Sequence, residues 1–218
     1  MLAALAIIYA IRNTSAARAR THQPVRIRVR LVLHGRLGRL MIGVVAFELG
    51  NAAATLLILR ATGLLEPGRS QTDATQLALV LYVLYNLAAT LISVPAGWHG
   101  DRSNPIRVRA ICFAAGYAVF GGGPHQLWLL ALAFVLAGLG IGCGETAQSA
   151  AVAALAPATL RGSAFGLLAT AQAGANLAAS AIAGILWTAV SPAAAFGFLA
   201  AAMIISVPLI LASIGTAR

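Results

Sequence analysis

Apolar residues fill long stretches of this chain, and short polar stretches separate them. Crossing roughly 30 Å of hydrocarbon takes about 20 residues in a helix. Segments of about this length cover residues 40–62, 76–98, 106–123, 126–156, 163–190 and 193–214. Barrel strands would be about 10 residues long and would alternate strictly, whereas these segments are continuous and rich in Ala, Leu and Gly. The pattern predicts an all-α, polytopic membrane protein with a six-helix transmembrane bundle over 40–218.

Composition supports the same class, because 60% of the residues are hydrophobic and only 9% are charged. A water-soluble domain of 218 residues could not cover so much apolar surface. The lipid bilayer is therefore the expected main partner of the chain.

Basic charge is distributed in a way that indicates membrane topology. The chain has 15 basic residues, all Arg, and 5 acidic ones. If the predicted spans alternate, only Arg60 and Arg69 lie on one side of the membrane. The other side carries Arg12, Arg18, Arg20, Arg26, Arg28, Arg30, Arg36, Arg39, Arg102, Arg107, Arg109, Arg161 and Arg218. The positive-inside rule then predicts a plasma (inner) membrane protein with both termini cytoplasmic, and it explains the charge without nucleic acid as a partner.

The first 39 residues differ from the rest of the chain. Residues 1–11 are apolar but reach only about 16 Å as a helix, so we interpret them as the end of a truncated transmembrane helix. Residues 12–39 are rich in Arg and contain Pro24, as expected of a basic cytoplasmic linker.

Two acidic residues lie inside predicted spans, where a carboxylate is costly unless a cavity or a partner receives it. Glu48 lies in the first span with Asn51 one turn further on, and Glu145 lies in the fourth with Gln148 beside it. Both acids fall roughly 12–18 Å from the cytoplasmic boundary, which suggests a shared cavity near mid-membrane. A carboxyl group in such a cavity can load and release a proton as access alternates. The alternative is that each Glu is hydrogen-bonded and only ties helices together.

Milder polar positions follow helical spacing in other spans. Asn86 lies in the second span, and Gln172, Asn176 and Ser180 lie in the fifth. These side chains are candidates for the substrate or proton pathway, or for hydrogen bonds between helices. In the fourth span, the series Gly138, Gly140, Gly142 and Gly144 contains two small-xxx-small patterns, which permit close helix contact and bending before Glu145.

Two loop motifs resemble those of a known family. Gly97-Trp98-His99-Gly100-Asp101-Arg102 is similar to the G-x-x-x-D-R loop signature of the major facilitator superfamily. The stretch from Pro157 to Gly166 resembles that family's P-x-x-x-R-G-x-A-x-G connection. The resemblance implies that the chain is the C-terminal six-helix half of such a transporter, from the end of the sixth helix to the twelfth.

The resemblance also carries functional expectations. The seventh and tenth helices of the family line its central pathway, and these would hold Glu48 and Glu145. Gly97, Asp101 and Arg102 would form a cytoplasmic gating loop.

We therefore expect a permease that moves a small-molecule solute by alternating access, coupled to protons. Its cavity would be completed by a missing N-terminal six-helix half or by a second copy. The alternatives are a membrane-embedded assembly protein and an inactive transporter fragment. The sequence shows no pattern of nucleophile, base or clustered ligands, so we expect no enzyme activity, no cofactor and no metal site.

Overall fold

The structure is a computed structural model that describes residues 35–98 and 105–215, and within these ranges it is helical throughout, without strands. Its helices are α3 (Gly35–Glu48), α4 (Ala54–Leu65), α5 (Gln71–Trp98), α6 (Pro105–Gly122), α7 (Leu127–Leu155), α8 (Arg161–Ala189) and α9 (Pro192–Gly215). The all-α class predicted for a membrane bundle is confirmed.

The first predicted span, 40–62, differs most from the structure. In its place are two helices, α3 and α4, separated by residues 49–53. The linker expected over 12–39 also ends early, because α3 already begins at Gly35. The physical reason is an apolar face on α3: Leu37, Leu40, Met41 and Val44 are buried in one cluster with residues of α7 and α8.

The later helices lie close to the segments predicted for them. α6, α7, α8 and α9 begin and end within two residues of the predicted bounds. α5 begins five residues before the predicted 76, because Ser70 caps its polar first turn: its hydroxyl accepts a hydrogen bond from the Asp73 backbone N–H at 3.1 Å.

Within the described residues, three helices are long and apolar enough to cross a membrane: Gln71–Ala96, Leu127–Leu155 and Arg161–Ala189. Shorter apolar helical stretches are Ala54–Leu65, Val108–Gly122 and Pro192–Ser206. The first predicted span therefore does not qualify as one helix, because its break divides the apolar sequence in two.

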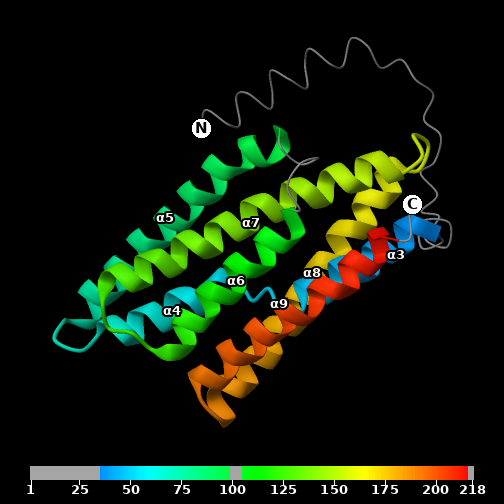
Figure 1. The fold of residues 1–218 in the computed structure, drawn as a ribbon. Helices are drawn as coiled ribbons and strands as arrows, with labels where there is room; N and C mark the ends of the chain where they lie inside the picture. Colours follow the sequence, from blue (N-terminus) through cyan, green and yellow to red (C-terminus); the bar gives the residue numbers. More distant parts are fainter. Residues whose placement is uncertain (1–34, 99–104, 216–218) are drawn as a thin grey trace.

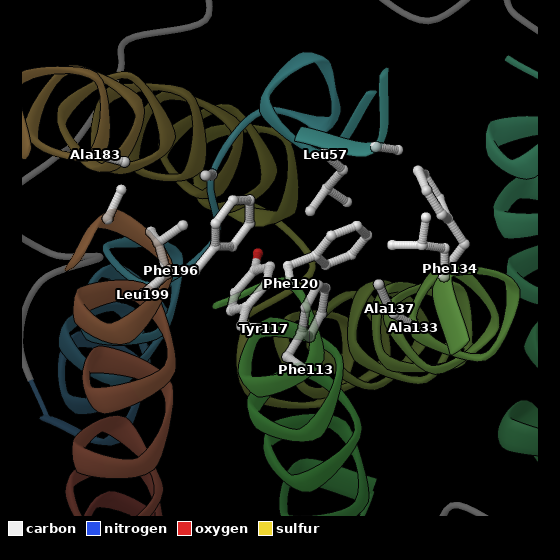
Figure 2. Packing of buried hydrophobic residues seen from close by; sticks show 14 of the residues in the cluster. Leu57, Phe113, Tyr117, Phe120, Ala133, Phe134, Ala137, Ala183, Phe196 and Leu199 are labelled. Carbon is white, nitrogen blue, oxygen red and sulfur yellow. The ribbon is translucent and has the colours of Figure 1, made fainter. Parts of the chain in front are cut away.

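The helices form two groups joined through the middle of the bundle. α5, α6 and α7 pack together with α4, whereas α3, α8 and α9 pack against one another (Figure 1). α6 and α9 make the main contact between the two groups. An aromatic cluster fills this contact: the Phe120 and Phe196 rings stack with centroids 5.3 Å apart, and Tyr117 and Phe113 continue the cluster along α6 (Figure 2).

The glycine series of α7 allows two neighbouring helices to approach closely. A Cβ atom on Gly138 or Gly142 would collide with backbone carbonyl groups of α5, at Tyr85 and Ala89. A Cβ atom on Gly140 or Gly144 would collide with side chains of α6. The two overlapping small-xxx-small patterns thus lie on different faces of α7. Gly138 and Gly142 face α5, and Gly140 and Gly144 face α6.

This packing makes substitution at Gly142 costly. We expect Gly142→Ala to destabilise the bundle by about 1–3 kcal/mol, because the added methyl group must displace the α5 backbone. The measurement is the thermal unfolding midpoint of the detergent-solubilised chain. Gly174→Ala is the matched control, since no atom lies within 4 Å of a Cβ at Gly174. Equal losses in the two variants would contradict the packing argument.

Candidate functional site

The break between α3 and α4 is the centre of the candidate site. A broken helix leaves backbone N–H and C=O groups without their usual partners, and an apolar surrounding offers no water to replace them. Two tight turns close the end of α3, where the Gly50 N–H donates to the Phe47 carbonyl at 2.9 Å and the Asn51 N–H to the Glu48 carbonyl at 3.0 Å. Gly50 has no room for a side chain, because a Cβ there would lie 2.9 Å from the Met203 backbone nitrogen on α9.

Two polar side chains of α8 complete the hydrogen bonding of the break. The Asn176 amide donates to the Asn51 carbonyl oxygen, and the Ser180 hydroxyl accepts a hydrogen bond from the Ala53 backbone N–H at 2.9 Å. Asn176 and Ser180 are four residues apart and so lie on one face of α8. The polar residues predicted on this helix therefore supply hydrogen-bond partners to the backbone between α3 and α4.

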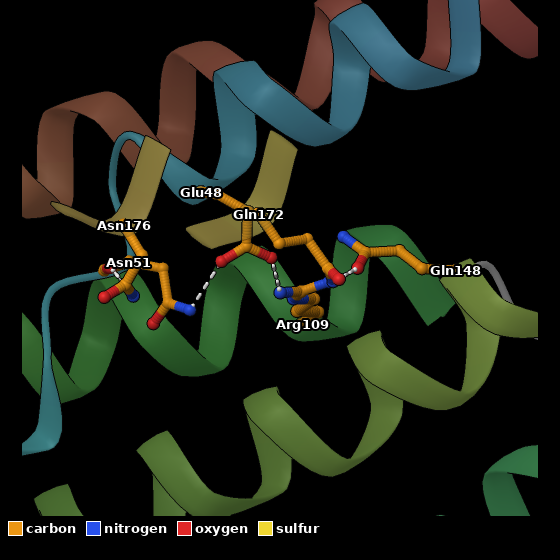
Figure 3. A network of polar contacts seen from close by, with 6 residues as sticks. All are labelled: Glu48, Asn51, Arg109, Gln148, Gln172 and Asn176. Carbon is orange, nitrogen blue, oxygen red and sulfur yellow. Dashed lines mark hydrogen bonds and ion pairs between the residues drawn. The ribbon is translucent and has the colours of Figure 1, made fainter. Parts of the chain in front are cut away.

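Glu48 lies at the end of α3 and is buried, with a relative exposure of 4%. Each of its carboxylate oxygens accepts a hydrogen bond from a different side chain (Figure 3). The Asn51 amide donates to Oε2 at 2.7 Å, and the guanidinium Nη2 of Arg109 donates to Oε1 at 3.0 Å. Glu48 and Arg109 therefore form a buried ion pair between α3 and α6.

Arg109 is held from three directions. Its Cζ atom lies 3.4 Å from the centroid of the Phe47 ring, a cation–π contact, while Glu48 binds the edge of the guanidinium. On α7 the guanidinium lies against Gly144, where any side chain would overlap it. The cation also lies near the C-terminal end of α3, where the helix dipole favours positive charge.

The structure corrects the prediction for Arg109, which the topology argument placed among the loop arginines. The side chain is 3% exposed and lies within the bundle. It points inward because Glu48 and Phe47 supply a counter-charge and an aromatic face. Twelve arginines rather than thirteen then support the positive-inside assignment.

A second polar contact joins α7 and α8. Gln172 donates from Nε2 to Oε1 of Gln148 at 2.7 Å, and Gln148 is buried (Figure 3). Since Gln172 and Asn176 are one turn apart on α8, this helix binds both α7 and the break through one polar face.

The remaining predicted site residues are not joined to this network. Glu145 lies on α7 with its side chain exposed, although it is close enough to Arg109 for an electrostatic interaction. Asn86 is also exposed, and its amide donates to the Tyr82 carbonyl of its own helix at 2.8 Å. Glu48 is enclosed and paired, whereas Glu145 is exposed, and the shared cavity expected for the two acids stays a prediction.

The predicted cytoplasmic gating loop falls largely outside the described residues. Asp101 and Arg102 lie there, and so do residues 1–11 and most of the 12–39 linker. Gly97 lies in the last turn of α5. Among the described residues, no group of three or more His, Cys, Asp or Glu side chains could hold a metal ion.

The sequence model of the Major Facilitator Superfamily matches residues 37–216. The chain belongs to the major facilitator superfamily. It is therefore an integral membrane protein of a family whose members are transporters, in contact with the lipid bilayer and with a solute. The chain matches no curated protein and no solved structure.

In this major facilitator, the hydrogen bond from Asn176 to the break provides a test of the site. We expect Asn176→Leu to destabilise the chain by about 1–2 kcal/mol, because it leaves the Asn51 carbonyl without a donor in an apolar interior. Asn86→Leu should cost far less, since the Asn86 side chain is exposed and bonded within its own helix. Thermal unfolding midpoints of the two variants in the same detergent measure the difference, and equal midpoints would refute the assigned role.

Proposed function

We propose that this major facilitator moves a small solute by alternating access and couples the movement to protons through Glu145. The observation that carries the proposal is the different surroundings of the two acids. Glu48 already has a cation and an amide as partners. Among the described residues, Arg109 forms its ion pair with Glu48, and Glu145 is exposed without an ion-pair partner.

A proton carrier must reach the proton source and must also change its electrostatic partner during the cycle. Glu145 is exposed on α7 and lies within electrostatic reach of Arg109, so its position suits both conditions if the helices move relative to one another. Gln148, one turn further along α7, and Gln172, its hydrogen-bond partner on α8, add amide groups that can bind a polar solute near the carboxylate.

The exposed side of Glu145 requires a second wall, because a carboxylate facing hydrocarbon would cost several kcal/mol. We infer that this wall is another six-helix half, either the product of preceding coding sequence or a second copy of this chain. In this arrangement the solute lies between the halves. The arginine distribution supports an inner-membrane location with both termini in the cytoplasm and Arg60 and Arg69 on the far side.

The decisive variant is Glu145→Gln, which keeps the shape of the side chain but cannot release a proton. We expect it to abolish solute-linked proton uptake into proteoliposomes, read by a trapped pH-sensitive dye while pools of small solutes are added. The chain is reconstituted alone, which allows two copies to pair. It is also reconstituted as the product of an extended reading frame that includes any coding sequence upstream of it.

Glu66→Gln is the matched control, since Glu66 is an exposed acid at the end of α4. We expect its proton uptake to equal that of the unchanged chain. Unaltered uptake in Glu145→Gln would remove the coupling role. Absence of solute-linked proton movement in both reconstitutions would favour the assembly-protein alternative.

A further inference from the structure

Each oxygen of the Glu48 carboxylate already accepts a hydrogen bond from a neighbouring side chain. One oxygen accepts from Arg109 at 3.0 Å and the other from Asn51 at 2.7 Å. Both side chains of the ion pair are almost completely enclosed, with exposures of 3% for Arg109 and 5% for Glu48. A group that exchanges protons with water needs access to it, and this geometry exposes very little of either side chain.

Other titratable groups lie near the pair without taking part in the hydrogen bonds of Glu48. Tyr117 on α6, Tyr85 on α5 and Cys143 on α7 interact with Glu48 or Arg109 electrostatically, as does Glu145 on α7. In the described part of the chain, Arg109 is the cation in contact with Glu48.

We propose that Glu48 and Arg109 form a permanently charged clasp, in which Arg109 is the positioning residue that keeps Glu48 ionised and fixes the end of α3 against α6 and α7. The clasp follows from the contacts of Glu48 and Arg109 alone. Its consequence for transport, that Glu145 rather than Glu48 exchanges protons, rests on the proposed function.

The chemistry of the two groups predicts an asymmetry between single substitutions. A carboxylate that loses its cation in an apolar interior can take up a proton and become neutral, whereas a guanidinium cannot lose one. Arg109→Gln therefore leaves a carboxyl group that can become neutral, whereas Glu48→Gln leaves a buried guanidinium that stays charged. Replacing both side chains removes both charges, which is often tolerated where single replacements are not.

The first test is a double-mutant cycle on the unfolding midpoint of the full chain in detergent. We expect Glu48→Gln to lower the midpoint by roughly 10 °C, Arg109→Gln to lower it less, and the double variant to recover most of the loss. Arg109→Lys keeps the charge and should fall between the unchanged chain and Arg109→Gln. Additive losses in the double variant would overturn the clasp.

The second test reads the protonation state directly, by infrared absorption of protonated carboxylic acids at neutral pH. Arg109→Gln should gain an absorption that is absent from the unchanged chain and from the double variant, because Glu48 without its cation becomes protonated. A carboxylic-acid absorption in the unchanged chain that Glu48→Gln removes would overturn the proposal. Neither test depends on transport, so a failure of the proton-flux assay would count against the proposed function alone.

Discussion

An apolar environment makes a buried polar group without a partner costly, and this constraint organises the middle of the bundle. The break after Glu48 exposes backbone groups that lipid cannot bind. Side chains of α8 satisfy part of them, and Glu48 itself is held by Asn51 and Arg109. Four helices, α3, α4, α6 and α8, are thereby fixed around one interruption of regular structure.

Much of the fold could be predicted from the sequence, because long apolar runs bounded by polar residues specify helices in lipid. The break was not predicted, since residues 49–53 contain no Pro and only Gly50 and Asn51 interrupt the apolar sequence of the flanking helices. The break coincides with a long-range contact, in which the Gly50 backbone packs against Met203 on α9, more than 150 residues away. Periodicity along a single segment carries no such information.

The candidate site was predicted in part. Glu48, Asn51 and Asn176 meet around the break, and Gln148 meets Gln172, as their polar character in apolar segments suggested. Arg109 was missed because its charge fitted a simpler explanation, the excess of arginine on the cytoplasmic side. The signal that could have found it was its position within α6, on the same face as Phe113, where an unpaired cation would face the apolar interior.

The glycines of α7 have a mechanical consequence. On the α5 side, backbone meets backbone at Gly138 and Gly142, and on the α6 side Gly140 and Gly144 lie against the buried side chains of Phe113 and Arg109, so these contacts leave little room to absorb a change in spacing. We therefore expect α5, α6 and α7 to move as one rigid unit in any conformational change. α8 differs from these helices, because a Cβ added at any of its glycines would meet no atom within 4 Å. Its contacts with its neighbours combine packing of small and apolar side chains with a few amide and hydroxyl hydrogen bonds, so α8 is the helix that can shift most readily against the others.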